Sequence, residues 1–303
     1  MRGLAVLGAL PIGFRVDSSA GDVVVWHEEL AADLVAAGYR PGSEPAFAQS
    51  ELSGRRPLRE VTLGEQTFLV RRFHHGGLLR WLTGERFLDA ERPFRELVLS
   101  ARLRERGVRT PPVVAARARR LFPVGHMLEV VTRRVPRATD LGFALGRAWR
   151  GELDRVVRHK LLTATGRFVA ELHGHGLLHA DLTPNNMLVN RSALDGAEPE
   201  LWTIDLDGAT LDRLDDPRRV ANLRRLYRFI DRHGEGHAHP LTRADFARFF
   251  RGYDPSGATW KSDWRAILAG YEATRGAHVA GRKLQRMFGG EGHLKSRGLA
   301  AEE

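Results

Sequence analysis

A pair of short polar motifs in the second half of the chain limits its fold more than any other feature. The first, residues 179–188, reads HADLTPNNML and contains Asp181 and Asn186. The second, residues 204–208, reads IDLDG and contains Asp205. Carboxylate and amide oxygens are ligands that Mg²⁺ prefers, and a carboxylate beside a hydroxyl can take its proton. The chain must therefore bring two separate turns together at one polar site.

The spacing of these motifs resembles the catalytic loop and the metal-binding loop of protein kinases. That resemblance implies that Asp181 accepts or orients the proton of an attacking hydroxyl. It also implies that Asn186 and Asp205 hold the magnesium ion that bridges the phosphates of ATP. Asp207 follows Asp205 by two positions, where strand alternation places it on the same side. We therefore expect Asp207 either as a further magnesium ligand or as a side chain that caps the loop.

Upstream, residues 53–73 alternate as two antiparallel strands joined by a turn at residues 64–66. Kinases usually carry a lysine in the second of these strands, where it binds the α- and β-phosphates. The first lysine of this chain is Lys160, so an arginine must take this role. Arg71 and Arg72 are the candidates, and they point to opposite faces of the sheet. We favour Arg71 and expect Arg72 to be solvated.

Two more segments belong to the expected nucleotide site. Gly54 and Arg55 precede the hairpin, where backbone amides and a guanidinium group would face the phosphates. With its single glycine, the segment fits an ordinary basic turn equally well. Residues 92–106 are predicted to form a helix, in which Glu96 pairs with the strand arginine. The alternative for Glu96 is a surface carboxylate near any arginine.

The remaining pattern is mainly helical after one more hairpin. Two strands are predicted around a turn at residues 123–125. The later predicted elements are a helix at 154–175, a hairpin of 187–190 with 201–206, a basic helix at 218–232, and helices within 241–286.

Four stretches together resemble the lipopolysaccharide kinase family, which includes the 3-deoxy-D-manno-octulosonic acid (Kdo) kinases and the heptose kinases of Gram-negative bacteria. They read LVRRFHHGGLL, RPFREL, HADLTPNNMLV and IDLDGA. The resemblance runs over residues 53–232, and the Kdo kinase branch also carries arginine in the strand before an RGGL-like loop. It implies an α+β, protein-kinase-like fold of two lobes. The expected parts are an extension packed on the N-lobe (1–52), a small antiparallel-sheet N-lobe (53–136), a mainly helical C-lobe (137–288) and a disordered tail (289–303).

The resemblance also implies a function and a location. The expected activity is ATP- and Mg²⁺-dependent phosphorylation of a sugar hydroxyl of the lipopolysaccharide inner core, either on Kdo linked to lipid A or on a core heptose. The expected location is cytoplasmic, peripheral on the inner face of the inner membrane. Two alternatives remain: another small-molecule kinase of the aminoglycoside or choline type, and a catalytically inactive kinase-fold scaffold.

Charge and composition narrow the partners. The chain of 303 residues has a formal net charge of +10, carried almost wholly by arginine, and contains no cysteine. Disulfides and zinc–thiolate sites are therefore excluded. An arginine excess favours a phosphate-rich partner such as an anionic membrane surface, although it also fits a general arginine preference on a solvated surface. No nucleic-acid recognition motif accompanies the charge, so we expect no nucleic-acid partner.

Overall fold

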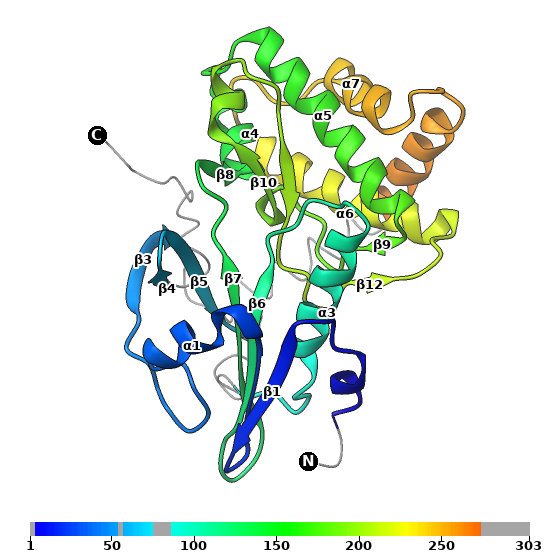
Figure 1. The fold of residues 1–303 in the computed structure, drawn as a ribbon. Coiled ribbons are helices and arrows are strands. Elements are labelled where there is room, and N and C mark those ends of the chain that lie inside the picture. Colours follow the sequence, from blue (N-terminus) through cyan, green and yellow to red (C-terminus); the bar gives the residue numbers. More distant parts are fainter. Residues whose placement is uncertain (1–3, 54–56, 75–85, 274–303) are drawn as a thin grey trace, which may run out of the picture. The chain divides into compact units, whose positions relative to one another are not determined.

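The computed structural model describes residues 4–53, 57–74 and 86–273 (Figure 1). These residues form two compact units. The sheet unit contains the described residues up to Glu105 together with Pro111–Val135. The helical unit contains Arg106–Thr110 and the described residues from Pro136 onward. The predicted Gly54 and Arg55 segment and the predicted tail at 289–303 lie outside the described residues.

Seven antiparallel strands make the sheet unit. Their bounds are β1 Phe14–Ser19, β2 Asp22–His27, β3 Ala48–Ser53, β4 Pro57–Leu63, β5 Gln66–Arg72, β6 Val113–Arg120 and β7 His126–Arg133. The spatial order is β1-β2-β6-β7-β5-β4-β3. The predicted hairpin is confirmed, since Leu63 pairs with Gln66 across a turn at Gly64, whose φ of 58° suits glycine. The predicted strands around residues 123–125 are confirmed as β6 and β7.

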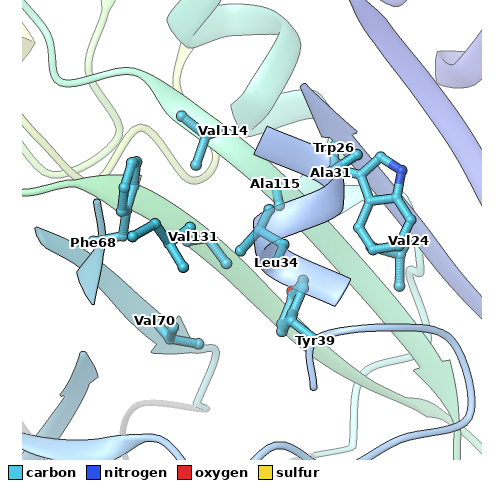
Figure 2. Close-up of a cluster of buried hydrophobic side chains, with 11 residues drawn as sticks. Val24, Trp26, Ala31, Leu34, Tyr39, Phe68, Val70, Val114, Ala115 and Val131 are labelled. Carbon is cyan, nitrogen blue, oxygen red and sulfur yellow. The ribbon is translucent and has the colours of Figure 1, made fainter. Parts of the chain in front are cut away.

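Helices cover both faces of this sheet. Helix α1 (Glu28–Ala36) supplies Leu34 to an apolar cluster that includes Val70 and Val131 (Figure 2). Helix α3 (Arg92–Glu105) supplies Phe94 and Leu97 to a second cluster, which includes Val130. Val130 and Val131 are consecutive in β7, so the two clusters lie on opposite faces of the sheet. Helix α3 confirms the helix predicted at 92–106 within one residue.

The segment expected as an extension packed on the N-lobe (1–52) contributes β1 and β2 to the sheet itself. Strand β2 pairs with β6 over Asp22–Trp26 and joins β1 by its other edge. Its side chains are apolar on both faces: Trp26 packs beside α1, whereas Val25 packs in the α3 cluster. A strand that is apolar on both sides is stable only where both faces are covered. A short 3-10 helix, η1 (Ala5–Ala9), lies before β1.

The helical unit contains two small sheets and several helices. Its helices are α4 Leu141–Trp149, α5 Arg155–Gly174, α6 Asp216–Gly234 and α7 Arg243–Tyr253, and residues 260–273 are also helical. One sheet has the order β11-β10-β8, formed by β8 Ala138–Asp140, β10 Met187–Asn190 and β11 Leu201–Thr203. The other pairs β9 Leu177–Leu178 with β12 Thr210–Leu211, and the 3-10 turns are η2 Pro184–Asn186 and η3 Arg191–Asp195.

Side-chain caps explain where these helices begin. The Asp154 carboxylate accepts a hydrogen bond from the Val156 amide at the start of α5, and Asp215 does the same for Arg218 in α6. At α7, Thr242 and Asp245 cap each other's backbone amides reciprocally. The antiparallel sheet in one unit and the mainly helical second unit confirm the predicted α+β class.

Candidate active site

Asp181 and Asn186 lie on the loop that joins β9 to β10. The chain enters β9 through Gly176, whose φ is +77° and whose Cα faces the Asp212 carbonyl so closely that an added Cβ would lie 2.4 Å from the oxygen. Only glycine fits that position. The loop ends in η2, which passes directly into β10. Both site residues therefore lie between two short strands, β9, which pairs with β12, and β10, which pairs with β8 and β11.

The two side chains contact each other. Asn186 Nδ2 donates to the Asp181 backbone oxygen at 2.8 Å and to Asp181 Oδ2 at 3.1 Å. Because the amide nitrogen makes both bonds, the amide oxygen of Asn186 remains on the other side of the group, where it can bind a cation. Asp181 is exposed, so a substrate hydroxyl can reach its carboxylate.

Backbone hydrogen bonds attach the second motif to the first. The Ile204 amide donates to the Asn186 carbonyl at 3.0 Å, and His179 Nε2 donates to the Ile204 carbonyl at 3.0 Å. Asp205 follows immediately, is exposed, and adopts a left-handed backbone with φ of 58°. That conformation is uncommon for a residue other than glycine and is often found at functional sites. The predicted loop pair is therefore brought together.

The argument from strand alternation for Asp207 is wrong. Strand β11 ends at Thr203 instead of Leu206, so Asp205 and Asp207 lie in a turn. The left-handed Asp205 and Gly208, with φ of 70°, break the period of two that the argument assumed. A Cβ on Gly208 would lie 3.4 Å from Ala180 of the first loop. Asp207 is half-buried in this turn, and its role stays a prediction.

His179 is an internal support for both loops. Its Nδ1 accepts a hydrogen bond from the Asp181 amide at 3.1 Å, so Nε2 must carry the proton that is donated to Ile204. The ring is therefore neutral, and its burial lowers the pKa of His179. Both ring nitrogens are occupied, which leaves neither for a metal.

A buried chain of hydrogen bonds continues from His179 into the helices. Asn222 of α6 donates through Nδ2 to the His179 carbonyl at 2.7 Å. The Asn222 side-chain oxygen contacts His173 Nε2 of α5 at 3.1 Å, and His173 Nδ1 contacts the Tyr253 hydroxyl of α7 at 2.8 Å. Asn222 is 1% exposed, so its amide must be satisfied inside the protein.

An ion pair determines which group donates and which accepts in each hydrogen bond of this network. Arg219 donates to the Tyr253 hydroxyl oxygen at 3.2 Å and is held by Asp263 through bonds of 2.7 and 2.8 Å. Since arginine only donates, the Tyr253 hydroxyl gives its proton to His173 Nδ1, and His173 donates from Nε2 to Asn222. Burial lowers the pKa of His173 to about 4, which keeps the ring neutral, as these donor and acceptor roles require.

We did not identify Asn222 and His173 from the sequence. The available signal was a polar side chain on the buried face of each helix, next to Leu223 in α6 and Leu172 in α5. Such residues need partners, but the partners are distant in sequence. The sequence alone therefore did not identify the network.

In the sheet unit, Arg71 and Glu96 form the expected ion pair. Arg71 Nη2 contacts the two Glu96 oxygens at 2.6 and 2.5 Å, and Glu96 is 4% exposed. The expectation that Arg72 is solvated is wrong. Its Nε donates to Glu129 at 3.1 Å on the opposite face, where Glu129 also pairs with Arg59. A buried carboxylate requires such cations, so it holds Arg72 against the sheet.

The residues present fit a magnesium ion bound together with phosphates. Among the described residues, no three His, Asp or Glu side chains are placed to hold a metal by themselves. Magnesium commonly uses one or two protein oxygens, with phosphates and water completing its shell. The amide oxygen of Asn186 and the exposed carboxylate of Asp205 match that ligand set.

Comparisons with known proteins agree with this geometry. The family model described as "Lipopolysaccharide kinase (Kdo/WaaP) family" matches residues 44–253. A 3-deoxy-D-manno-octulosonic acid kinase of Actinobacillus succinogenes is 25% identical over 222 residues, covering 68% of this chain and 85% of the relative. The Vibrio vulnificus kinase of the same name is 28% identical over 216 residues, covering 67% and 81%.

A solved structure supports the fold. The protein titled "WaaP in complex with acyl carrier protein" matches with a TM-score of 0.52 and 22% identity, covering 80% of this chain and 90% of that one. At this identity the match demonstrates a shared fold only. Within the described residues, every helix is too short or too polar to cross a bilayer.

Proposed function

Since this chain belongs to the lipopolysaccharide kinase (Kdo/WaaP) family, we propose that it transfers the γ-phosphoryl group of ATP to a sugar hydroxyl of the lipopolysaccharide inner core. Kdo linked to lipid A is the acceptor that we favour, because relatives of this chain are named 3-deoxy-D-manno-octulosonic acid kinases. A core heptose is the alternative acceptor. The observation that carries the proposal is the contact of Asn186 with Asp181 beside the Ile204–Asp205 turn.

Each residue has a defined task in this reaction. Asp181 accepts or orients the proton of the sugar hydroxyl while the hydroxyl oxygen attacks the γ-phosphorus, and the bond from the γ-phosphorus to the β–γ bridging oxygen breaks to release ADP. Asn186 and Asp205 would hold Mg²⁺, which would neutralise phosphate charge when bound. Arg71, oriented by Glu96, binds the α- and β-phosphates in place of the usual lysine. Asp207 is proposed as an additional magnesium ligand, and Gly54 and Arg55 are proposed to cover the phosphates.

The test is phosphoryl transfer from radiolabelled ATP to Kdo–lipid A, with Mg²⁺ and the full-length chain. Labelled lipid is expected with the native protein. Replacing Asp181 with Asn should lower kcat by roughly 10²–10⁴, because the base is lost while the nucleotide contacts remain. The matched control is Asp195→Asn, an exposed aspartate in η3, which should keep full activity.

Three outcomes would contradict the proposal. No transfer to lipid, while a known Kdo kinase works in parallel, would favour an inactive scaffold. Transfer to an aminoglycoside or to choline, but not to lipid, would assign another small-molecule kinase. An Asp181→Asn protein as active as the native chain would remove Asp181 from the mechanism.

We also propose that the enzyme works at the cytoplasmic face of the inner membrane, where its lipid-linked acceptor would be found. The net charge of +10 supports attraction to an anionic leaflet.

A further inference from the structure

The turn between β6 and β7 carries an unusual group of exposed apolar side chains. Phe122 is 89% exposed, Val124 is 59% exposed, and Leu88, from the adjoining segment, is 83% exposed. Leu88 and Val124 line a hollow of about 390 Å³ together with Arg120 and His126. We call Arg86–Leu88 and Arg120–His126 the hairpin tip. Single exposed apolar residues are ordinary, but a cluster of this kind indicates contact with a partner.

Several backbone groups of the hairpin tip are hydrogen-bonded within the protein. The Leu121 amide donates to the Gly125 carbonyl at 2.8 Å. Arg86 Nη1 donates to the carbonyls of Phe122 and Val124 at 2.9 and 3.1 Å. Phe87 and His126 exchange both backbone bonds at 2.9 and 2.8 Å. These internal bonds lower the cost of moving the turn out of water, because unpaired backbone groups are the main cost of placing backbone in lipid.

The charge around the hairpin tip is positive. Arg86 and Arg120 are both exposed, and Arg86 lies at the base of the apolar side chains through its bonds to the turn. The adjacent acidic residue, Asp89, is paired with Arg95. Guanidinium groups at the base of an apolar tip suit the phosphate layer of an anionic bilayer, with the apolar side chains below it.

We propose that the hairpin tip docks the protein on an anionic lipid surface. Phe122, Val124 and Leu88 enter the boundary between head groups and acyl chains, and Arg86 and Arg120 contact lipid phosphates. A protein partner fits less well, because three such side chains offer roughly 500 Å² at most, whereas a stable protein interface buries about 800 Å² on each partner. The proposal deepens the membrane association suggested above, but its test needs no kinase activity.

The first experiment measures binding of the full chain to vesicles by sedimentation. Vesicles of phosphatidylcholine mixed with phosphatidylglycerol are compared with vesicles of phosphatidylcholine alone. The native chain should bind the anionic vesicles. The double variant Phe122→Ser, Val124→Ser should bind at least about tenfold more weakly, because two apolar anchors are lost. Val156→Ser is the matched control, since Val156 is 61% exposed on α5 in the other unit, and it should bind as the native chain does.

The charge is tested separately. Arg120→Gln should weaken binding to the anionic vesicles roughly fivefold, as expected for one arginine at such a surface. It should leave the weak binding to phosphatidylcholine unchanged. The control is Arg102→Gln, which removes the same charge from an exposed position on α3. Equal losses from both variants would mean that net charge, and not the hairpin tip, directs the binding.

A spectroscopic readout locates the contact. The chain has no cysteine, so Val124→Cys can carry a single polarity-sensitive fluorophore, with Val156→Cys as its control. The emission should shift to shorter wavelength on anionic vesicles only at position 124. The proposal fails if neither probe shifts or if both shift equally. It also fails if the double serine variant binds normally but unfolds at a lower temperature, which would mean that these side chains stabilise the folded protein and do not contact lipid.

Discussion

At the residue scale, the spacing of the motif residues indicated the chemistry before any contact was known. Asp181, Asn186 and Asp205 were identified by type and position, and the structure places the first two in direct contact. Strand alternation placed Arg71 and Arg72 on opposite faces of a strand, and Arg71 was the favoured candidate. In the structure Arg71 is the arginine that pairs with Glu96, because α3 covers its face of the sheet. The catalytic and ligand roles themselves stay predictions.

The buried His173 gives a stability prediction that depends on pH. Burial lowers its pKa from 6.5 to about 4, so between these values the unfolded chain binds more protons than the folded chain. The free energy of unfolding should therefore fall as the pH drops from 6.5 to about 4, by up to about 3 kcal/mol from this residue. Urea unfolding at several pH values measures the loss.

The comparison for this prediction is His173→Gln, which cannot take up the proton. Its unfolding free energy should be lower at neutral pH, because the Asn222 and Tyr253 contacts change, but it should fall less steeply with acid. His237→Gln, at an exposed site, should retain the native slope. If His173→Gln kept the native slope, then His173 protonation would not contribute to acid unfolding.

At the element scale, apolar periodicity predicted most helices and hairpins correctly. They did not predict how closely α5 and α7 approach. Gly166 of α5 faces the Phe249 carbonyl and Gly252 of α7 faces the Thr163 carbonyl, so that added Cβ atoms would lie only 1.9 and 2.0 Å from those oxygens. From the sequence alone, a glycine inside a helix is expected to lower the stability of that helix. The close crossing explains why they are there.

Replacing Gly166 with Ala tests this packing. Alanine favours an isolated helix by about 1 kcal/mol over glycine, so helix propensity predicts stabilisation. We expect a net loss of about 2 kcal/mol instead, since the helices must separate to admit the methyl group. Gly174→Ala, on the same helix, is the control. Apart from its chain neighbours and the helix's own nearby backbone, no atom lies within 4 Å of a Cβ added there, so this variant should not destabilise the protein. Equal effects of the two variants in urea unfolding would contradict the close crossing.

At the scale of the whole molecule, the family match and the folded unit begin at different places. The match starts at residue 44, but the sheet unit also needs β1, β2 and α1. Trp26, Leu34 and Tyr39 from this early segment are at most 1% exposed. They cover the sheet face that includes Val131 (Figure 2). The segment was expected as an extension because it carries no motif.

A chain that begins at residue 44 should therefore fail to form a soluble monomer. Removing β1 and β2 leaves β6 as an unpaired edge and exposes the apolar cluster beneath α1. Size-exclusion chromatography and binding of a hydrophobic dye measure the outcome. A chain that begins at Gly13 keeps both strands and α1, so it should remain monomeric. A well-folded monomer from residue 44 onward would show that the early strands are dispensable.

The sequence by itself determined the features that depend on neighbouring residues. These are the main helical segments, the alternation that makes the hairpins, and the polar side chains of the two motifs. Tertiary structure alone decided the ion pair of Arg71 with Glu96, the left-handed backbone of Asp205, and the hydrogen bond from Asn222 to His179. The physical reason is the separation along the chain of the residues that interact. Periodicity and alternation depend on a few neighbouring residues, whereas these contacts depend on packing between segments that are distant in the chain.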